Sequence, residues 1–195
     1  MFHAVDRSVR VGRMLNIVEL LKDLAGYCVA SQGIDAVISA KRDVIELYMV
    51  FKWLTLIMMW VFGLNGFWSS AVVAYLIAQN VFTYFDHHVW SVRGNLDEDR
   101  IKMRFVMVLQ AVVFNVVCFS YLFANQFNGD FNWGSFSSSN PLIPLSFSFM
   151  NTLSGGSSVA TPTTAAGVVL LGLQVFTTFV FLTVILTKAT TKEGV

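Results

Sequence analysis

Long apolar stretches alternate with short polar ones along this chain of 195 residues. A helix crosses a hydrocarbon core about 30 Å thick when it has roughly 20 mostly apolar residues. The stretches that meet this length are Val44–Leu64, Phe67–Phe85, Ile101–Phe123 and Ala165–Leu186. We therefore predict an all-α integral membrane protein with four transmembrane helices.

The N-terminal region, residues 1–43, shows an amphipathic pattern instead. Its apolar positions at helical spacing are Met14, Val18, Leu21 and Leu24. This pattern fits a helix lying on the inner membrane surface, and it fits equally a small cytoplasmic helix that packs on its neighbours. Gly33 predicts a break before a second short helix that leads into the first span.

The composition agrees with this fold class. Hydrophobic residues make up 55% of the chain and charged residues 13%, whereas a soluble domain is about a quarter charged. The net charge of +1 gives no electrostatic reason to expect a nucleic-acid partner. The lipid bilayer is the partner that the composition predicts.

The positions of the basic residues predict the orientation. All 13 Lys and Arg fall on one side of the predicted spans. The other side holds the turn Asn65–Gly66 and the segment Ala124–Thr164, whose only charge is Asp130. Cytoplasmic loops carry the excess of Lys and Arg. We therefore expect a multi-pass protein with both termini cytoplasmic and Ala124–Thr164 outside.

That outer segment contains a short apolar stretch followed by a run of small residues. Pro141 and Pro144 are compatible with the first turn of a short helix over Leu142–Leu153. The run that follows is Ser154, Gly155, Gly156, Ser157 and Ser158. Non-helical backbone is not tolerated in lipid but is tolerated along a water-filled path. The run is therefore either an extracellular linker or part of a pore.

The order of short motifs favours the pore. Phe147-Ser148-Phe149 reads F-S-F, Gly156 follows, and Thr161–Thr164 reads T-P-T-T. This order resembles tetrameric pore-loop cation channels of the potassium-channel type. In that family a pore helix containing F-S-F precedes the filter T-V-G-Y-G-D and a T-P-T-T-like start of the inner helix.

The resemblance implies a homotetramer around a central pore, with a re-entrant pore helix and filter loop between helices three and four. Residues 44–90 would be two peripheral helices, and residues 101–190 the pore module of outer helix, turret, pore helix, filter and inner helix. The filter positions would be Ser154, Gly155, Gly156, Ser157 and Ser158. Because the family's valine, tyrosine and second glycine are missing, we expect monovalent cations, K⁺ or Na⁺, to pass with weak or unusual selectivity.

One stripe on the last span is a candidate for the pore surface. Gln174, Thr178, Phe181 and Ile185 recur at helical spacing. On a pore face they would form a polar cavity leading to an apolar constriction. Alternatively, Gln and Thr join membrane helices by hydrogen bonds.

We expect no enzyme activity, cofactor or metal site. His3, His87 and His88 are predicted on the cytoplasmic side, across the membrane from Ser154 and Ser157, so a catalytic pair is excluded by this topology. Adjacent histidines on a helix also diverge by about 100°, which is unsuitable for a shared metal ion.

The predicted function is therefore a passive ion channel subunit. Two alternatives stay open. One is a non-conducting assembly or accessory protein whose extracellular loop docks a partner. The other is a holin-like protein that forms wide, unselective lesions.

Overall fold

The structure is a computed structural model. It describes residues 16–85, 98–154 and 159–190, with side chains at 16–85, 106–153 and 159–183. The described part is mostly helical, with one short two-stranded ladder. The chain divides into two compact units, Met1–Val61 and Phe62–Val195.

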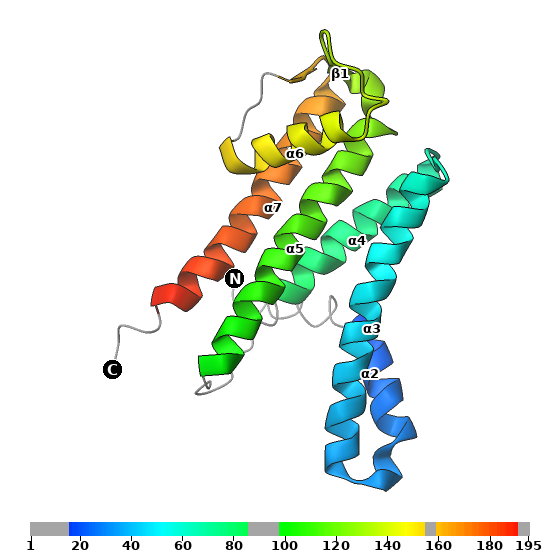
Figure 1. The fold of residues 1–195 in the computed structure, drawn as a ribbon, viewed down its shortest axis with the longest axis vertical. Coiled ribbons are helices and arrows are strands. Elements are labelled where there is room, and N and C mark those ends of the chain that lie inside the picture. Colours follow the sequence, from blue (N-terminus) through cyan, green and yellow to red (C-terminus); the bar gives the residue numbers. More distant parts are fainter. Residues whose placement is uncertain (1–15, 86–97, 155–158, 191–195) are drawn as a thin grey trace, which may run out of the picture. The chain divides into compact units, whose positions relative to one another are not determined.

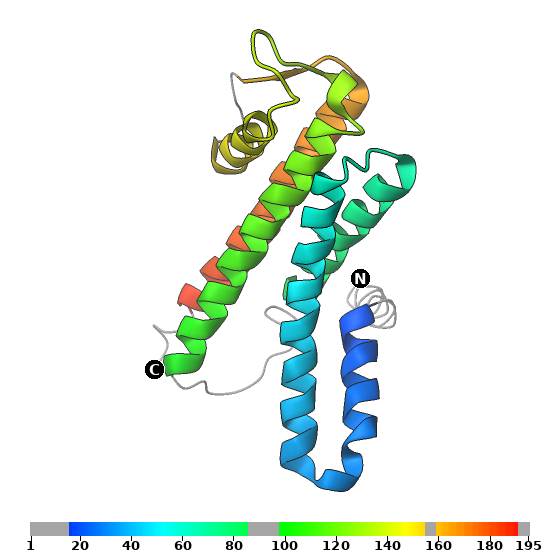
Figure 2. The same ribbon diagram turned by 45° about the vertical axis from the view of Figure 1, so that its right-hand side comes forward.

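The first unit is a helical hairpin, visible in Figure 2. Helix α2 (Ile17–Cys28) begins after Asn16, whose side-chain oxygen accepts from the backbone N–H of Val18 at 3.1 Å. A 3₁₀ turn, η1 (Ala30–Gln32), leads to Gly33, which has a φ of 104°. The predicted break at Gly33 is confirmed, because glycine adopts this left-handed conformation without strain.

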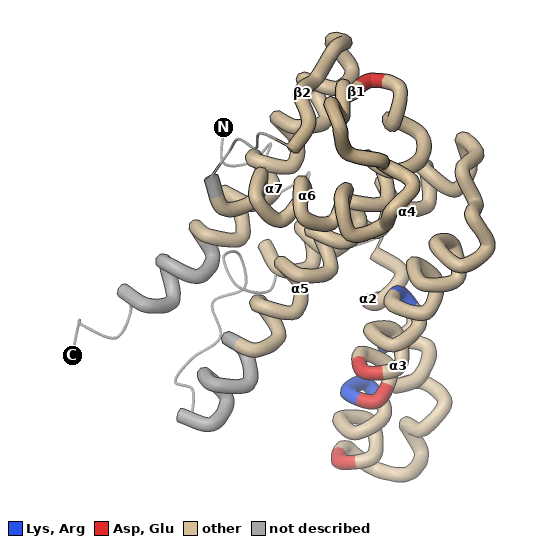
Figure 3. The backbone as a smooth tube through the Cα atoms, turned by 45° about the horizontal axis from the view of Figure 1, so that its top comes forward, with Lys and Arg blue, Asp and Glu red and all other residues tan. Residues whose placement is uncertain are grey.

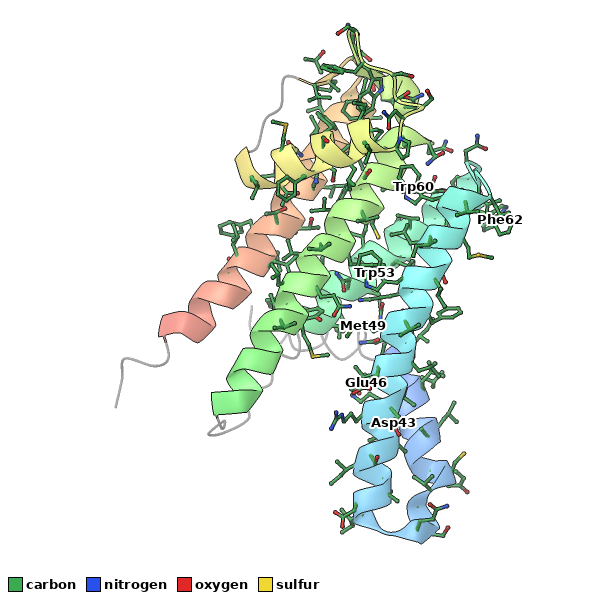
Figure 4. All side chains as sticks on the ribbon, viewed as in Figure 1. Asp43, Glu46, Met49, Trp53, Trp60 and Phe62 are labelled. Atoms are coloured by element: carbon green, nitrogen blue, oxygen red, sulfur yellow. The ribbon has the colours of Figure 1, made fainter. Side chains whose placement is uncertain are left out.

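Helix α3 (Ile34–Val61) is longer than the predicted first span. The second short helix expected after Gly33 is continuous with that span, because no proline or glycine interrupts Ile34–Val61. All of its charged residues except Lys52 lie in the first half, which includes Asp43 and Glu46, while Trp53 and Trp60 lie in the more apolar second half (Figure 4).

Helix α2 packs against the first part of α3. A Cβ added at Gly26 would meet the Lys41 side chain at 2.8 Å, so the helices approach closely there. Lys41 also lies 3.5 Å from an Asp23 carboxylate oxygen. Helix α2 therefore packs on a neighbour while Leu20, Leu24 and Tyr27 stay exposed, and both placements predicted for this helix stay open.

The second unit contains the remaining elements. In chain order they are α4 (Phe67–Phe85), α5 (Glu98–Ala124), η3 (Asn128–Asp130), β1 (Phe131–Asn132), α6 (Leu142–Ser154), β2 (Thr161–Pro162) and α7 (Ala165–Thr190). Helices α5 and α7 run in opposite directions beside each other (Figure 1). Strands β1 and β2 pair antiparallel, with Phe131 opposite Pro162.

Helix α4 packs against α5 and α7 through polar and aromatic contacts. Asn80 donates to the Ala111 carbonyl at 3.0 Å, and the Tyr84 hydroxyl donates to the Met107 carbonyl at 2.8 Å. The Tyr84 ring also meets Phe181 of α7 edge to face, with centroids 5.8 Å apart. Hydrogen bonds of this kind join helices where no water competes.

Within the residues that the structure describes, three helical segments are long and apolar enough to cross a membrane: Ile34–Val61, Val106–Ala124 and Ala165–Thr183. These correspond to the predicted first, third and fourth spans. Helix α4 forms over the whole predicted second span but is not among the three. The polar residues that reduce its hydropathy are Ser69, Ser70, Gln79, Asn80 and Thr83.

Charge is distributed unevenly in the second unit. Among its described side chains the one charged residue is Asp130, beside β1 (Figure 3). The sequence places Arg100, Lys102 and Arg104 at the start of α5 and Lys188 near the end of α7. Since α5 and α7 are antiparallel, these basic residues belong to the end of the helix pair opposite Asp130.

Candidate pore loop

Helix α6 is the short helix predicted before the Ser/Gly run. It has 13 residues and begins after Asn140, whose side-chain oxygen accepts from the Leu142 N–H at 3.1 Å. Pro144 lies in the first turn, where its missing N–H removes no helical hydrogen bond. The helix is too short to cross a bilayer and lies against the same end of both α5 and α7 (Figures 1 and 2).

Aromatic packing holds the first half of α6. The Phe147 ring is buried, and its centroid lies 5.0 Å from Phe123, 5.5 Å from Trp133 and 5.6 Å from Phe131, each edge to face. These rings come from the end of α5 and from the β1 segment. Removing such a buried ring costs about 3–5 kcal/mol, so Phe147 is a main attachment of α6.

A polar network holds the second half of α6. Gln174 of α7 is 1% exposed, and its Nε2 lies 2.8 Å from both the carbonyl and the hydroxyl oxygen of Ser148 and 2.9 Å from the Thr152 hydroxyl. Its Oε1 accepts from Asn151 Nδ2 at 2.7 Å. The Ser148 hydroxyl donates in turn to the Val116 carbonyl of α5 at 2.7 Å. One glutamine therefore connects three successive polar positions of α6 to α7.

A third attachment lies where the chain returns to α7. The Asp130 carbonyl accepts from the Thr163 N–H at 2.8 Å, and its carboxylate accepts from the Thr164 hydroxyl at 2.6 Å. The Thr164 hydroxyl accepts from the Gly167 N–H at 3.2 Å. The Thr164 hydroxyl therefore caps the last helix.

This attachment leaves no room for a side chain at position 167, which is occupied by Gly167. A Cβ at Gly167 would lie 2.7 Å from the Asp130 carbonyl oxygen and 3.2 Å from Pro162 Cβ. The contact brings the first turn of α7 directly against the segment that precedes β1. The chain is therefore held on both sides of the loop between α6 and β2. Before the loop, α6 is bonded to Gln174, and after it Thr163 and Thr164 are bonded to Asp130.

The predicted filter lies mainly outside the described residues. Ser154 is the last residue of α6, but its side chain is not described. Gly155, Gly156, Ser157 and Ser158 lie outside the described residues, as do His3, His87 and His88. Their assignment therefore stays a prediction.

Two residues of the predicted pore-lining stripe, Gln174 and Phe181, are not on the outer surface of the second unit. Gln174 is buried against α6, and Phe181, also 1% exposed, packs with Val108 and Ala111 of α5. A side chain enclosed in this way cannot line a pore formed between copies of the chain, so we withdraw these two residues from that surface. Gln174 and Phe181 join α7 to α6 and α5 of the same chain.

The other two members of the stripe are less constrained. Thr178 is half-buried, and its hydroxyl donates to the Gln174 carbonyl at 2.9 Å. Ile185 belongs to α7, but its side chain is not described. Pore lining by these two residues stays a prediction.

The apolar side chains of α6 are divided between two environments. Phe147 and Pro144 are buried, whereas Phe149 is 54% and Leu153 71% exposed. One side of α6 is therefore apolar and exposed in the single chain.

Sequence reasoning missed several residues of the network. Ser148, Asn151 and Thr152 recur three and four positions apart in an otherwise apolar helix, and this spacing was the available signal. Their common partner could not be predicted, because nothing in the sequence shows that Gln174 of α7 contacts α6. Within the part of the chain that the structure describes, no group of three His, Cys, Asp or Glu side chains is placed to hold a metal ion.

The fold and the α6 site define a mostly helical protein with span-length helices, as a multi-pass membrane protein requires. Comparisons with protein-family models, with curated proteins and with solved structures give no match to this chain.

Proposed function

We propose that this protein is a subunit of a passive ion channel, in which four copies surround a central pore for monovalent cations, K⁺ or Na⁺. One observation carries the proposal. A short apolar helix, α6, is attached to two span-length helices and is followed immediately by the run Ser154–Ser158. Irregular backbone at membrane depth is tolerated where it borders water, and a helix attached in this way brings such backbone to that depth.

The chemistry of the run supports cation passage. Ser154, Gly155, Gly156 and Ser157 supply hydroxyl and carbonyl oxygens without bulky side chains. Four copies would present rings of neutral oxygens, which replace part of the water around an ion. The C-terminal end of α6 directly precedes this run in the sequence and carries the negative end of the helix dipole, which also favours cations.

Four copies are proposed because the order of F-S-F, glycine and T-P-T-T resembles that of tetrameric pore-loop channels. Phe149 and Leu153 of α6 are exposed, as are Phe176 and Phe179 of α7. Neighbouring copies or lipid would cover these side chains. Any part of α7 that lines the pore belongs to this exposed side rather than to Gln174 or Phe181.

The proposed topology has four spans. Helix α4 joins α5 through Asn80 and Tyr84, and this anchoring supports a fourth span despite its polar residues. The opposite placement of Asp130 and the basic helix ends supports an external α6 end and cytoplasmic termini.

The test is ion flux from liposomes that contain the purified protein, with K⁺, Na⁺, Cl⁻ and a bulky organic cation compared in parallel. Passage of K⁺ or Na⁺ alone is the expected result. Passage of every ion, including the bulky one, would indicate a wide lesion instead. No flux from a folded tetramer would overturn the channel proposal and favour an accessory protein.

A further inference from the structure

A small cavity lies between the last turns of α6 and the helices α5 and α7. Its volume is about 10 Å³, which is about the smallest space that admits one water molecule. Its polar lining consists of Asn115, Thr152, Gln174, Thr177 and Thr178. An apolar cavity of this size would stay empty, but a polar one of this size suits a water molecule.

Asn115 of α5 has an unused donor at this cavity. The residue is 5% exposed, and its Nδ2 is buried without a hydrogen-bond partner. The orientation of its amide follows from Asn80, whose Nδ2 donates to Asn115 Oδ1 at 3.4 Å and to the Ala111 carbonyl at 3.0 Å. With Oδ1 engaged in this way, Nδ2 is the atom left for the cavity. A buried donor without an acceptor is unfavourable.

The three threonines around the cavity supply complementary groups. Thr177 and Thr178 each donate to the Gln174 carbonyl at 2.9 Å, which leaves their oxygen lone pairs as acceptors. The Thr152 oxygen accepts from Gln174 Nε2 at 2.9 Å, and among the described residues no group accepts its hydrogen. The lining therefore presents two donors and two acceptors, which is the complement of one water molecule.

We propose that this cavity binds a single ordered water molecule that accepts from Asn115 and Thr152 and donates to Thr177 and Thr178. The water bridges α5, α6 and α7, and its contact on α6 is Thr152, two residues before Ser154. Its binding does not depend on ion conduction. A cation is the wrong occupant. The lining has no carboxylate, and the Asn115 amide presents N–H groups that repel a positive charge.

The test is a water-to-amide cross-relaxation spectrum of the full-length protein, labelled with ¹⁵N in detergent micelles. The expected result is a cross-peak between the Asn115 side-chain NH₂ and a long-lived water. Thr178→Ser, which keeps the hydroxyl, retains the cross-peak, and Thr178→Val weakens it at least severalfold. Asn115→Leu removes the side-chain NH₂, so the cross-peak that disappears in this variant is assigned to Asn115.

Two results would overturn the proposal. One is absence of the cross-peak in wild-type protein whose other amide signals are native, because the cavity would then be dry. The other is a Tl⁺-dependent shift of the Asn115 and Thr178 signals, because a monovalent cation would then occupy the site. If Asn115→Leu fails to fold, the Thr178 pair still decides the question.

Discussion

Asn151 of α6 donates to Gln174 of α7 across 2.7 Å, and both side chains are buried. A buried amide pair in an otherwise apolar setting is stable only when its remaining groups are also bonded. Gln174 satisfies this condition through Ser148 and Thr152. The pair therefore holds the last turns of α6 against α7, directly before the Ser/Gly run.

Gln174→Leu should detach the second half of α6. The substitution leaves the side-chain donor of Asn151 buried without its partner and removes the bonds to Ser148 and Thr152, which costs about 1–3 kcal/mol. We expect a clearly lower midpoint of thermal unfolding in detergent. Gln126→Leu is the matched control because Gln126 is exposed after α5. Equal midpoints for the two variants would show that the network contributes nothing.

Two glycines of α7 should respond to alanine with opposite signs. Gly167→Ala places a methyl group 2.7 Å from the Asp130 carbonyl, so we expect a loss of about 1–3 kcal/mol. A Cβ at Gly172 meets no atom of the described chain within 4 Å. Gly172→Ala should be neutral or stabilise by up to about 1 kcal/mol through helix propensity. Equilibrium unfolding of both variants measures the difference, and a reversed order contradicts the close approach at Gly167.

Thr164 should matter more than its partner Asp130. Thr164→Ala removes both the cap of α7 and the bond to the carboxylate, with an expected loss of about 1–2 kcal/mol. Asp130→Ala removes one of these bonds and keeps the backbone bond to Thr163. Thr164→Ser should behave almost as wild type. A double-mutant cycle on Asp130 and Thr164 that is strictly additive would be inconsistent with their contact.

The two natural cysteines test the proposed topology. Cys28 is exposed in α2 and Cys118 is buried in α5. In intact cells an impermeant maleimide should leave both unlabelled, and permeabilisation should expose Cys28 alone. Ser135→Cys in a chain that also carries Cys28→Ser should be labelled without permeabilisation, since Ser135 is exposed in the proposed outer segment. Labelling of Cys28 in intact cells would reverse the orientation.

Hydrophobic length predicted the helices well. The starts of α4, α6 and α7 agree with the predicted residues, because prolines, glycines and a capping threonine mark them. Helix α3 was predicted ten residues too short at its start, since the sequence before Val44 is polar but contains no helix breaker.

The roles of polar residues inside helices were predicted less well. Periodicity places Gln174 and Phe181 on one side of α7, but it does not tell whether that side meets a pore or a neighbouring helix. That choice depends on the angle between α6 and α7, which is a tertiary property. Asn115 and Asn151 were overlooked for the same reason, because each becomes informative only when its partner is known.

The most direct measurement of the channel proposal is K⁺ and Na⁺ flux through Gly156→Val, beside wild type and Gly129→Val, in the same liposomes. Valine at Gly156 adds bulk at the proposed filter. Gly129 lies before β1, where a Cβ meets nothing of the described chain within 4 Å. The proposal predicts flux in wild type and Gly129→Val and none in Gly156→Val, with all three proteins tetrameric. Undiminished flux through tetrameric Gly156→Val would contradict it.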